Sequence, residues 1–540
     1  MKLNLRVASV AAGLLGHVFA QHADRQIAII GAGAAGTSAA YFLRQFASEA
    51  GVNVNITLFE RTDRIGGRTR TINVFDDPSQ PFEQGASIFV QINHVLYDSM
   101  IKFGLTPRDP DVSSDPLFGI WDGDKFVLAI DANAPSWWNS LKVLFRYGLS
   151  APKRTRELRL DTIGRFLRIY TPDFFPFKSL TERAEQLNLT EATGVTGQQY
   201  LKAHGIGGLF ASEFIQSFTR VNYASNLARL NGLVTMVSLS TDGAIAVQGG
   251  NWQIFDEMAR RSGAHIALDT AVVELSKEGS KYSVKTTSGR SKTAPKSYDA
   301  SFDNVIIANP FQFSGISPGL GVLSTKIEPV DYVRLHVTIF TSPKSYSPAF
   351  FKLSDSSRVP GVVMTTLNES DSPTSGPDGV GKPGFFSISI LGKATNPKTQ
   401  EREYVYKIFS PETVTPEFLS KLLGEPVPST FTGDSSPISW YKATVFHSYP
   451  KITPRTTFQD PIIGPGVYYT GGMEAFISTM ETSALMGKNI ARLIVDDILT
   501  ERGKMGNPED SERENWFEDE KQAVLNRLDV GGNMGLYFDS

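Results

Sequence analysis

Cysteine is absent from all 540 residues of the sequence. The chain therefore has no disulfide bridge, no cysteine metal ligand, no thiol nucleophile and no cysteinyl attachment point for a cofactor. Its stability must come from its apolar core and from the ligands that it binds, because a ligand that binds only the folded state adds stability by mass action.

Several other features are scarce. The seven histidines are spread out, and none has a partner at metal-ligand spacing, so we expect no metal site. No Ser/His/Asp arrangement is evident. The formal net charge is -3 and no dense Lys/Arg cluster occurs, which disfavours nucleic acid as a partner. After the N-terminal region, no segment reaches the roughly 18 uninterrupted apolar residues of a membrane span, so we expect no transmembrane anchor.

The most informative pattern lies near the N terminus. An apolar run at residues 26–30 leads into a turn with Gly31, Gly33 and Gly36, an Ala-rich helical pattern follows, and a second apolar run ends at Glu60. This order is typical of a dinucleotide-binding βαβ unit. Its glycines permit a tight turn, close approach of a diphosphate and close helix packing, and its acidic residue binds a ribose. We expect the phosphates at the N terminus of the helix.

A second glycine pair decides between dinucleotides. Arg64 precedes Gly66, Gly67 and Arg68 directly after the second strand. This doublet resembles that of the two-dinucleotide-binding-domain flavoproteins, which include amine oxidases, phytoene desaturases and prenylcysteine oxidases, where it packs on FAD. Two glycines let the main chain approach the cofactor, and an arginine can neutralise a phosphate. The resemblance favours FAD over NAD, bound without a covalent link.

Further segments resemble the cofactor contacts of these flavoproteins. A Gly-Ala step after the doublet would run beside the isoalloxazine ring, strands at residues 265–275 and 303–310 would return to the cofactor, and a last strand at 467–470 would precede a long helix ending near residue 499. Together, pattern and resemblance predict these FAD-contacting residues: Gly31, Gly33, Ala35, Gly36, Glu60, Arg61, Gly67, Arg68, Gly85, Ala86, Ser87, Val272, Asn309, Gly472, Glu474 and Thr482.

The fold class predicted is α/β, a Rossmann-type FAD-binding domain of the amine-oxidase-like kind with a mixed α+β substrate domain. We expect the FAD domain to be discontinuous, with its parts at 24–105, 228–320 and 455–500. The substrate domain would comprise a helical, aromatic-rich insertion at 106–227 and a strand-rich part at 321–454, whose strands lie mostly between 328 and 441. Residues 501–540 would form a C-terminal tail.

The N-terminal residues predict export. Lys2 and Arg6 precede an apolar run, and Ala20 closes a small-residue pattern suited to signal peptidase. Residues 1–20 are thus expected to be a signal peptide, and the mature chain to reach the secretory pathway and be secreted or lysosomal/vacuolar. Glycosylation triplets begin at three asparagines, of which we expect Asn55 to be modified less readily if its side chain faces inward: Asn55, Asn188 and Asn368.

Four short segments narrow the resemblance. Residues 82–89, 220–223, 247–252 and 478–484 resemble the prenylcysteine oxidase (prenylcysteine lyase domain) family, which is also secretory or lysosomal. The resemblance covers most of the mature chain. It implies FAD-dependent oxidative cleavage of farnesyl- or geranylgeranyl-cysteine to cysteine, a prenyl aldehyde and hydrogen peroxide, with molecular oxygen as the oxidant.

The implied reaction requires the protein mainly to position the thioether against the flavin. The C1–H bond of a prenyl thioether is allylic and beside sulfur, so loss of a hydride leaves a cation that both groups stabilise. Water then adds to this cation, and the resulting hemithioacetal collapses to an aldehyde and a thiol. A dry apolar groove matters more here than a strong base. The catalytic candidates are His336, on the strand at 333–340, and Glu481, at the start of the last helix. Each also has a purely structural interpretation: His336 as a hydrogen-bonded histidine of a sheet, and Glu481 as a carboxylate that caps a helix terminus or holds the fold.

Two alternatives stay open. An amine or polyamine oxidase would use the same scaffold, but those enzymes commonly carry a lysine near flavin N5, and the matching strand here offers Arg334 and His336. A secreted protein that binds lipid or prenyl groups and keeps FAD only structurally is the third hypothesis. Such a binder would leave the flavin oxidised under anaerobic substrate. The prenyl chain length and the oligomeric state are left open by the sequence.

Overall fold

The central sheet of the molecule carries the glycine turn at its edge. Its six strands lie in the order β10 (His265–Ala267), β2 (Val54–Phe59), β1 (Arg25–Ile30), β14 (Asn304–Ile307), β22 (Val467–Tyr469) and β21 (Ile462–Gly464). The first five strands run parallel, and β21 is antiparallel to β22. Numbered along the chain, the parallel strands read 3-2-1-4-5, so the order reverses between β1 and β14. The predicted α/β class with a Rossmann-type unit is confirmed.

The computed structural model describes residues 24–109, 117–131, 133–289, 294–433 and 435–503. The predicted signal peptide at 1–20 lies outside these ranges, as does nearly all of the predicted tail, residues 504–540.

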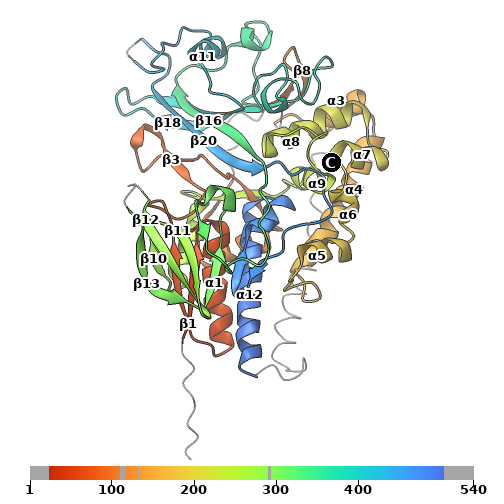
Figure 1. Ribbon diagram of the computed structural model, residues 1–540. Helices are drawn as coiled ribbons and strands as arrows, with labels where there is room; N and C mark the ends of the chain where they lie inside the picture. Colours follow the sequence, from red (N-terminus) through yellow and green to blue (C-terminus); the bar gives the residue numbers. More distant parts are fainter. Residues whose placement is uncertain (1–23, 110–116, 132, 290–293, 434, 504–540) are drawn as a thin grey trace, which may run out of the picture.

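Helices cover one face of the central sheet. This layer contains α1 (Ala34–Glu49), α2 (His94–Lys102), α10 (Trp252–Arg261) and α12 (Met480–Glu501), with α1 and α12 side by side (Figure 1). The contact is close because a Cβ at Gly487 of α12 would collide with the carbonyl oxygen of Ala35. Ile27 and Ile29 of β1 belong to the core on this side, whereas Ala28 and Ile30 belong to the core on the other.

A second sheet covers the opposite face. Its strands are β13 (Lys296–Phe302), β12 (Lys281–Ser288), β11 (Thr270–Glu278) and β15 (Ser317–Pro318). The single strand predicted at 265–275 is wrong. It is two strands, because the chain turns at Asp269, whose φ is 50°, so that β10 joins the central sheet and β11 the second one.

A seven-stranded sheet forms a roof above the central sheet (Figure 1). Its order is β20 (Trp440–Pro450), β16 (Tyr332–Ser342), β19 (Arg402–Ser410), β18 (Ser387–Thr395), β17 (Val362–Thr365), β7 (Leu117–Trp121) and β8 (Phe126–Asp131), with α11 (Pro416–Leu423) outside it. Two predictions needed correction. The insertion at 106–227 is not purely helical, because its first apolar runs form β7, which pairs with β17, and β8, which pairs with β7. The strand-rich part continues nine residues beyond residue 441 in β20.

Helices line one side of the roof. They are α3 (Ser136–Tyr147), α4 (Ser150–Leu167), α5 (Leu180–Gln186), α6 (Thr190–Thr193), α7 (Gly197–Ala203), a π-helical segment (Phe210–Ile215), α8 (Gln216–Tyr223) and α9 (Gly232–Ser238). Fully buried Arg220 ties them to the roof, since its guanidinium donates to Thr365 Oγ1 and to the carbonyl oxygen of Val380. In the described ranges, none of the helices is long and apolar enough to cross a bilayer.

Short strands complete the connections between the layers. β3 (Thr71–Asn73) pairs with β4 (Pro81–Glu83), and β9 (Ala244–Val247) pairs with both β5 (Phe89–Val90) and β6 (Pro107–Arg108). β3 and β4 lie in the stretch of chain between the second glycine pair and the Gly-Ala step, so their pairing brings these two segments together.

Candidate functional site

A cavity of about 500 Å³ lies between the central sheet and the roof. Its base is formed where β1, β2, β14 and β22 end, by Gly31, Glu60, Asn309 and Thr470. This is the point where the strand order of the parallel sheet reverses. Ligands of open α/β sheets bind at such switch points, outside the carboxyl ends of the strands.

The N terminus of α1 opens into this cavity. Gly33, Ala34 and Ala35 line it, and α1 has neither a side-chain cap nor an acidic residue in its first turn. The free N–H groups and the positive end of the helix dipole therefore suit an anion. A Cβ added to Gly67 would lie 3.0 Å from the Cα of Gly33, so the two glycine loops are in contact and leave room for a ligand only without side chains.

Glu60 has a role that the sequence did not reveal. Its Oε2 accepts the N–H of Ala32 at 2.9 Å, and its Oε1 accepts the N–H of Thr62 at 2.9 Å and the Thr62 hydroxyl at 2.8 Å. The carboxylate lines the cavity, as predicted, but it also holds the glycine turn against the end of β2. Glu60 thus shapes the site before any ligand arrives.

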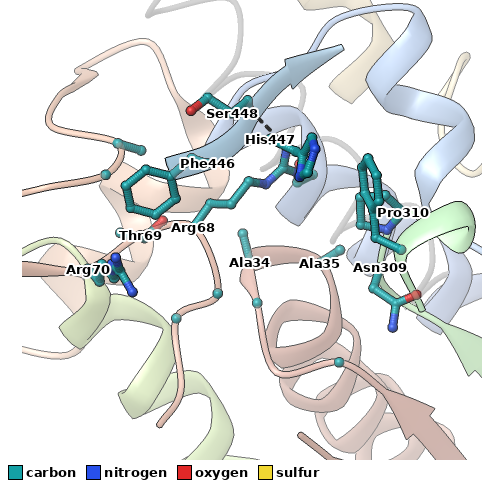
Figure 2. Close-up of a pocket in the computed structure, with 18 of the residues that line it drawn as sticks. Ala34, Ala35, Arg68, Thr69, Arg70, Asn309, Pro310, Phe446, His447 and Ser448 are labelled. Carbon is teal, nitrogen blue, oxygen red and sulfur yellow. Dashed lines mark hydrogen bonds between the residues drawn. The ribbon is translucent and has the colours of Figure 1, made fainter. Parts of the chain in front are cut away.

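The Arg68 side chain extends across the cavity to residues that lie far from it in the sequence. Its Nη2 lies 2.6 Å from Oε1 of Glu474, and its Nη1 donates to the carbonyl oxygen of Ser448 at 3.0 Å. Tyr332 donates to the other Glu474 oxygen at 2.7 Å. Burial lowers the pKa of Arg68, but the Glu474 carboxylate outweighs it and leaves that pKa above its usual value. Figure 2 shows the side chain between β20 and Ala34 at the start of α1.

A second arginine in the cavity lacks such compensation. Burial and, after it, the neighbouring Arg64 lower the pKa of Arg70 to about 10. Its guanidinium carbon lies 4.5 Å from the centroid of the Phe446 ring, and its Nε has no hydrogen-bond partner among the described residues. An uncompensated cation in the same cavity as the uncapped start of α1 fits an anionic ligand such as a dinucleotide.

The roof contributes an apolar wall. Leu335 and Val337 of β16, Phe409 of β19 and Phe446 of β20 line the cavity. Because side chains alternate along a strand, His336 between the first two faces the other side of the roof. There its Nδ1 lies 3.3 Å from Oγ1 of Thr413, and burial, with the charge of Arg334, lowers its pKa. The prediction of a catalytic His336 is not supported, because the ring does not reach the cavity.

Glu481 also lies outside the cavity. Its carboxylate, 2% exposed, accepts the N–H groups of Val95 and Leu96 at 2.9 Å and the hydroxyl of Tyr170 at 2.8 Å. It therefore caps the first turn of α2. Burial raises the pKa of Glu481 to about 7, although the three hydrogen bonds act in the opposite direction. Of its two interpretations, the structure supports the helix-terminal carboxylate.

Most of the predicted cofactor residues are brought together around the cavity. Those that line it are Gly31, Gly33, Ala35, Glu60, Arg61, Gly67, Arg68, Gly85, Ala86, Val272, Asn309 and Glu474. Four do not, and each has a packing role. A Cβ at Gly36 would strike the carbonyl oxygen of Gly31, and one at Gly472 would strike that of Gln459. Ser87 accepts from Lys407 Nζ at 3.0 Å, and Thr482 belongs to the capping box of α12.

The contribution of β20 was not predicted from the sequence. Thr444, Phe446, His447 and Tyr449 of this strand line the cavity, and the His447 ring stacks on Phe313 with centroids 4.3 Å apart. Figure 2 shows the strand running above Arg68. The available signal was the enrichment of aromatic and β-branched residues from 440 to 449, which favours a strand. In the part of the chain that the structure describes, no three acidic or histidine side chains are grouped to hold a metal ion.

The glycosylation triplets differ in access. Asn188 is exposed, and Asn55 is exposed as well, so the inward orientation considered for it does not occur. Asn368 is half-buried, and its amide nitrogen donates to Asp124 Oδ2 at 3.0 Å. The side-chain amide that glycosylation would modify is thus already bonded at Asn368.

Comparison with protein families gives two matches. Residues 130–507 match the model of the family described as prenylcysteine lyase, and residues 29–102 match an NAD(P)-binding Rossmann-like domain. The chain is 29% identical over 495 residues to the farnesylcysteine lyase of Arabidopsis thaliana, with 88% of this chain and 89% of the relative covered. It is 28% identical over 492 residues to prenylcysteine oxidase 1 of Bos taurus, with 87% and 88% covered.

Solved structures share the fold. A cyclohexylamine oxidase from Brevibacterium oxydans superposes with a TM-score of 0.54 at 16% identity, covering 88% of this chain and all of the other. A putrescine oxidase with bound putrescine gives a TM-score of 0.51 at 14% identity, with 88% and 99% covered. A fatty acid isomerase from P. acnes also gives 0.51, at 12% identity, with 87% and 98% covered. At these identities the likeness concerns architecture alone, which serves unrelated chemistries.

Proposed function

Because the chain belongs to the prenylcysteine lyase family, we propose that it is an FAD-dependent oxidase that cleaves the thioether of a prenylated cysteine. The products would be cysteine, a prenyl aldehyde and hydrogen peroxide. The names of the relatives, a farnesylcysteine lyase and prenylcysteine oxidase 1, support this substrate class. One observation carries the proposal. The floor of the cavity has the features of a dinucleotide-binding site, and the roof opposite that floor is apolar.

The residues around the base fit FAD. The uncapped start of α1 and the guanidinium of Arg68 would hold the diphosphate, and Glu60 would accept from the adenosine ribose. Gly85 and Ala86 line the cavity and would face the isoalloxazine ring. Packing on the chain requires the glycine, because a Cβ at Gly85 would collide with the carbonyl oxygen of Arg68. When bound, the flavin supplies a hydride acceptor. We propose that it is held without a covalent link, since there is no cysteine.

The apolar wall would hold the prenyl chain. Leu335, Val337 and Phe409 present no polar side-chain atoms, so they exclude water from the allylic carbon and orient it. Burial of a chain of 15 carbons contributes roughly 25 cal/mol for each Å² of apolar surface removed from water, which makes the prenyl group the main source of affinity. A farnesyl group has these 15 carbons.

One observation keeps amine oxidation as a second candidate. Lys407 is buried, and its Nζ donates to the carbonyl oxygen of Glu83 and to Ser87 Oγ, both at 3.0 Å. It therefore lies behind the Gly85 segment. No lysine occurs at residues 333–340, and this buried lysine stands on the neighbouring strand β19, outside the lining of the cavity. A lysine near flavin N5 is common in amine oxidases, so substrate specificity must be measured.

Anaerobic stopped-flow absorbance of the oxidised flavin band separates the candidates. We expect farnesylcysteine to bleach the flavin far faster than S-methylcysteine, and spermine to leave it oxidised. Reduction of the flavin, with addition of water to the substrate, should release cysteine and farnesal, and subsequent mixing with oxygen should reoxidise the flavin and give hydrogen peroxide. Bleaching by spermine but not by farnesylcysteine would establish the amine oxidase instead. A flavin that stays oxidised with all three compounds would support a prenyl-binding protein.

We also propose that the chain enters the secretory pathway. The basic residues, apolar run and small-residue pattern at 1–20 support this, and the family that the sequence resembles is secretory or lysosomal. Mass spectrometry of protein expressed in a eukaryotic host should find Gln21 at its N terminus. A chain that retains residues 1–20 would contradict the proposal.

A further inference from the structure

Large apolar side chains are exposed around one helix of the substrate domain. Trp138 and Phe145 on α3 are 48% and 84% exposed, and Leu149, just after the helix, is 73% exposed. Figure 1 shows α3 at the outer edge of the helical side, away from the central sheet. Isolated exposed apolar residues are normal, but a group of them on one element marks an interaction surface.

The spacing places these side chains on one face. Trp138 and Phe145 stand at positions i and i+7 of α3, with half-buried Leu141 at i+3 between them, and these positions share one side of a helix. The buried side carries Val143 and Asn139, and the Asn139 amide donates to the carbonyl oxygen of Asp131 at 2.8 Å. α3 is therefore anchored by its inner face while an apolar stripe points to solvent.

The same region is strongly basic in a chain of net negative charge. Residues 136–159 contain six basic residues and one acidic residue, whereas the whole chain carries -3. Ion pairs of the six include Arg146 with Glu213, Arg159 with Asp242 and, on the surface, Lys153 with Glu157. Lys153, whose side chain is 79% exposed, and Arg154 lie in the first turn of α4, next to Leu149. Lys153 has one acidic neighbour, Glu157, at 4.0 Å.

We propose that this face, defined as Trp138, Leu141, Phe145, Leu149, Lys153 and Arg154, docks the protein on an anionic lipid bilayer. An exposed aromatic and aliphatic stripe inserts into the boundary between headgroups and acyl chains, and neighbouring basic side chains are attracted to anionic headgroups. A second copy of the chain fits less well, because a two-fold contact would bring two basic regions together.

Docking would place the enzyme where an apolar prenyl conjugate dissolves. This consequence rests on the proposed function, whereas the docking itself rests only on the exposed side chains and their charge. A failure of prenylcysteine turnover would therefore leave the membrane surface standing, and a failure of vesicle binding would leave the proposed reaction standing.

Co-sedimentation of the full-length flavin-loaded protein with vesicles tests the proposal. We expect binding to phosphatidylcholine vesicles that contain phosphatidylserine, weaker binding without it, and release at high salt. Phe145→Glu and Leu149→Glu should each reduce the partition coefficient by about tenfold or more, because each removes a large apolar group and adds a negative charge. The matched control is Leu320→Glu, since Leu320 is fully exposed in a loop remote from α3 in sequence.

Flavin content and melting temperature verify that each variant is folded. Trp138→Phe gives an independent readout, because a quencher placed on the lipid should quench wild-type tryptophan fluorescence more than that of the variant. Absence of binding to phosphatidylserine vesicles would overturn the proposal, and so would equal binding by Phe145→Glu and Leu320→Glu. Self-association that Phe145→Glu abolishes, without any vesicle binding, would assign the face to a second copy.

Discussion

Arg68 and Glu474 are 406 residues apart in the sequence, yet their side chains meet at 2.6 Å across the cavity. Arg68 follows the second glycine pair, and Glu474 follows the last strand of the central sheet. Tyr332 from the roof donates to the same carboxylate. One ion pair thus connects both ends of the nucleotide-type domain to the roof, at the place where a diphosphate would lie.

The first prediction concerns this ion pair. Glu474→Ala should lower the free energy of unfolding by about 2 to 3 kcal/mol, because it leaves the Arg68 guanidinium and the Tyr332 hydroxyl without their acceptor. FAD affinity should fall as well, since Arg68 loses its fixed position. Urea unfolding and flavin titration measure the two effects. Glu474→Gln keeps one acceptor oxygen and should lose less. Equal stability of wild type and both variants would show that the pair contributes nothing.

The second prediction separates two roles of Glu60. Glu60→Ala should lower the melting temperature of flavin-free protein, because the Ala32 N–H and the Thr62 groups lose a buried acceptor. It should also weaken FAD binding through the ribose. If Glu60 served only the ribose, the melting temperatures of flavin-free wild type and variant would be the same, and only flavin-loaded protein would differ.

The sequence predicted the parts of the site that local constraints define. The turn with Gly31 and the doublet with Gly67 were recognisable because close backbone approach tolerates no side chain there, which leaves a signature in consecutive residues. The apolar parallel strands were also recognisable, since strands buried on both faces read as continuous apolar runs. Their order along the chain followed from the same pattern, but the length of β10 did not, because β10 and β11 were predicted as one strand.

The sequence did not predict the properties of the site that depend on residues far apart in the chain. His336 faces away from the cavity because of the parity of β16, and a shift of one residue would have reversed it. Glu481 caps a helix whose first turn lies 386 residues earlier in the chain, so no local pattern distinguishes it from a catalytic carboxylate. β20 joins the site only through pairing with β16. Such relationships come from the assembled fold.

The third prediction concerns pH. Burial raises the pKa of Glu481 to about 7 in the folded protein, above its unfolded value near 4.5. The folded state therefore holds the proton more tightly, and the stabilisation is fully present below pH 4.5 and lost as pH rises to about 7. Between these values the free energy of unfolding should fall by about 3 kcal/mol through this group.

Urea unfolding of wild type and Glu481→Gln across pH 4 to 8 isolates this effect, because all other groups titrate in both proteins. The difference in unfolding free energy, wild type minus variant, should decline from pH 4.5 to about 7 and stay level above it. Glu481→Gln should retain flavin reduction by substrate, because the side chain does not reach the cavity. A difference that rises with pH would mean that the carboxylate is ionised throughout.

The last prediction concerns the apolar wall. Val337 is buried, lines the cavity from β16 and is adjacent in the chain to His336, which faces away. Val337→Thr keeps the shape of the side chain but adds a hydroxyl to a surface meant for hydrocarbon, at a cost of about 1 to 3 kcal/mol if the hydroxyl stays unpaired. We expect about a tenfold rise in the farnesylcysteine concentration that half-saturates flavin reduction, with FAD affinity unchanged.

Two control variants accompany Val337→Thr. His336→Gln tests the opposite face of the roof and should leave flavin reduction within about twofold of wild type. Val363→Thr, in the roof core on β17 away from the cavity, controls for the loss of stability and should not alter half-saturation. If His336→Gln slowed reduction and Val337→Thr did not, the substrate would have to lie on the other side of the roof.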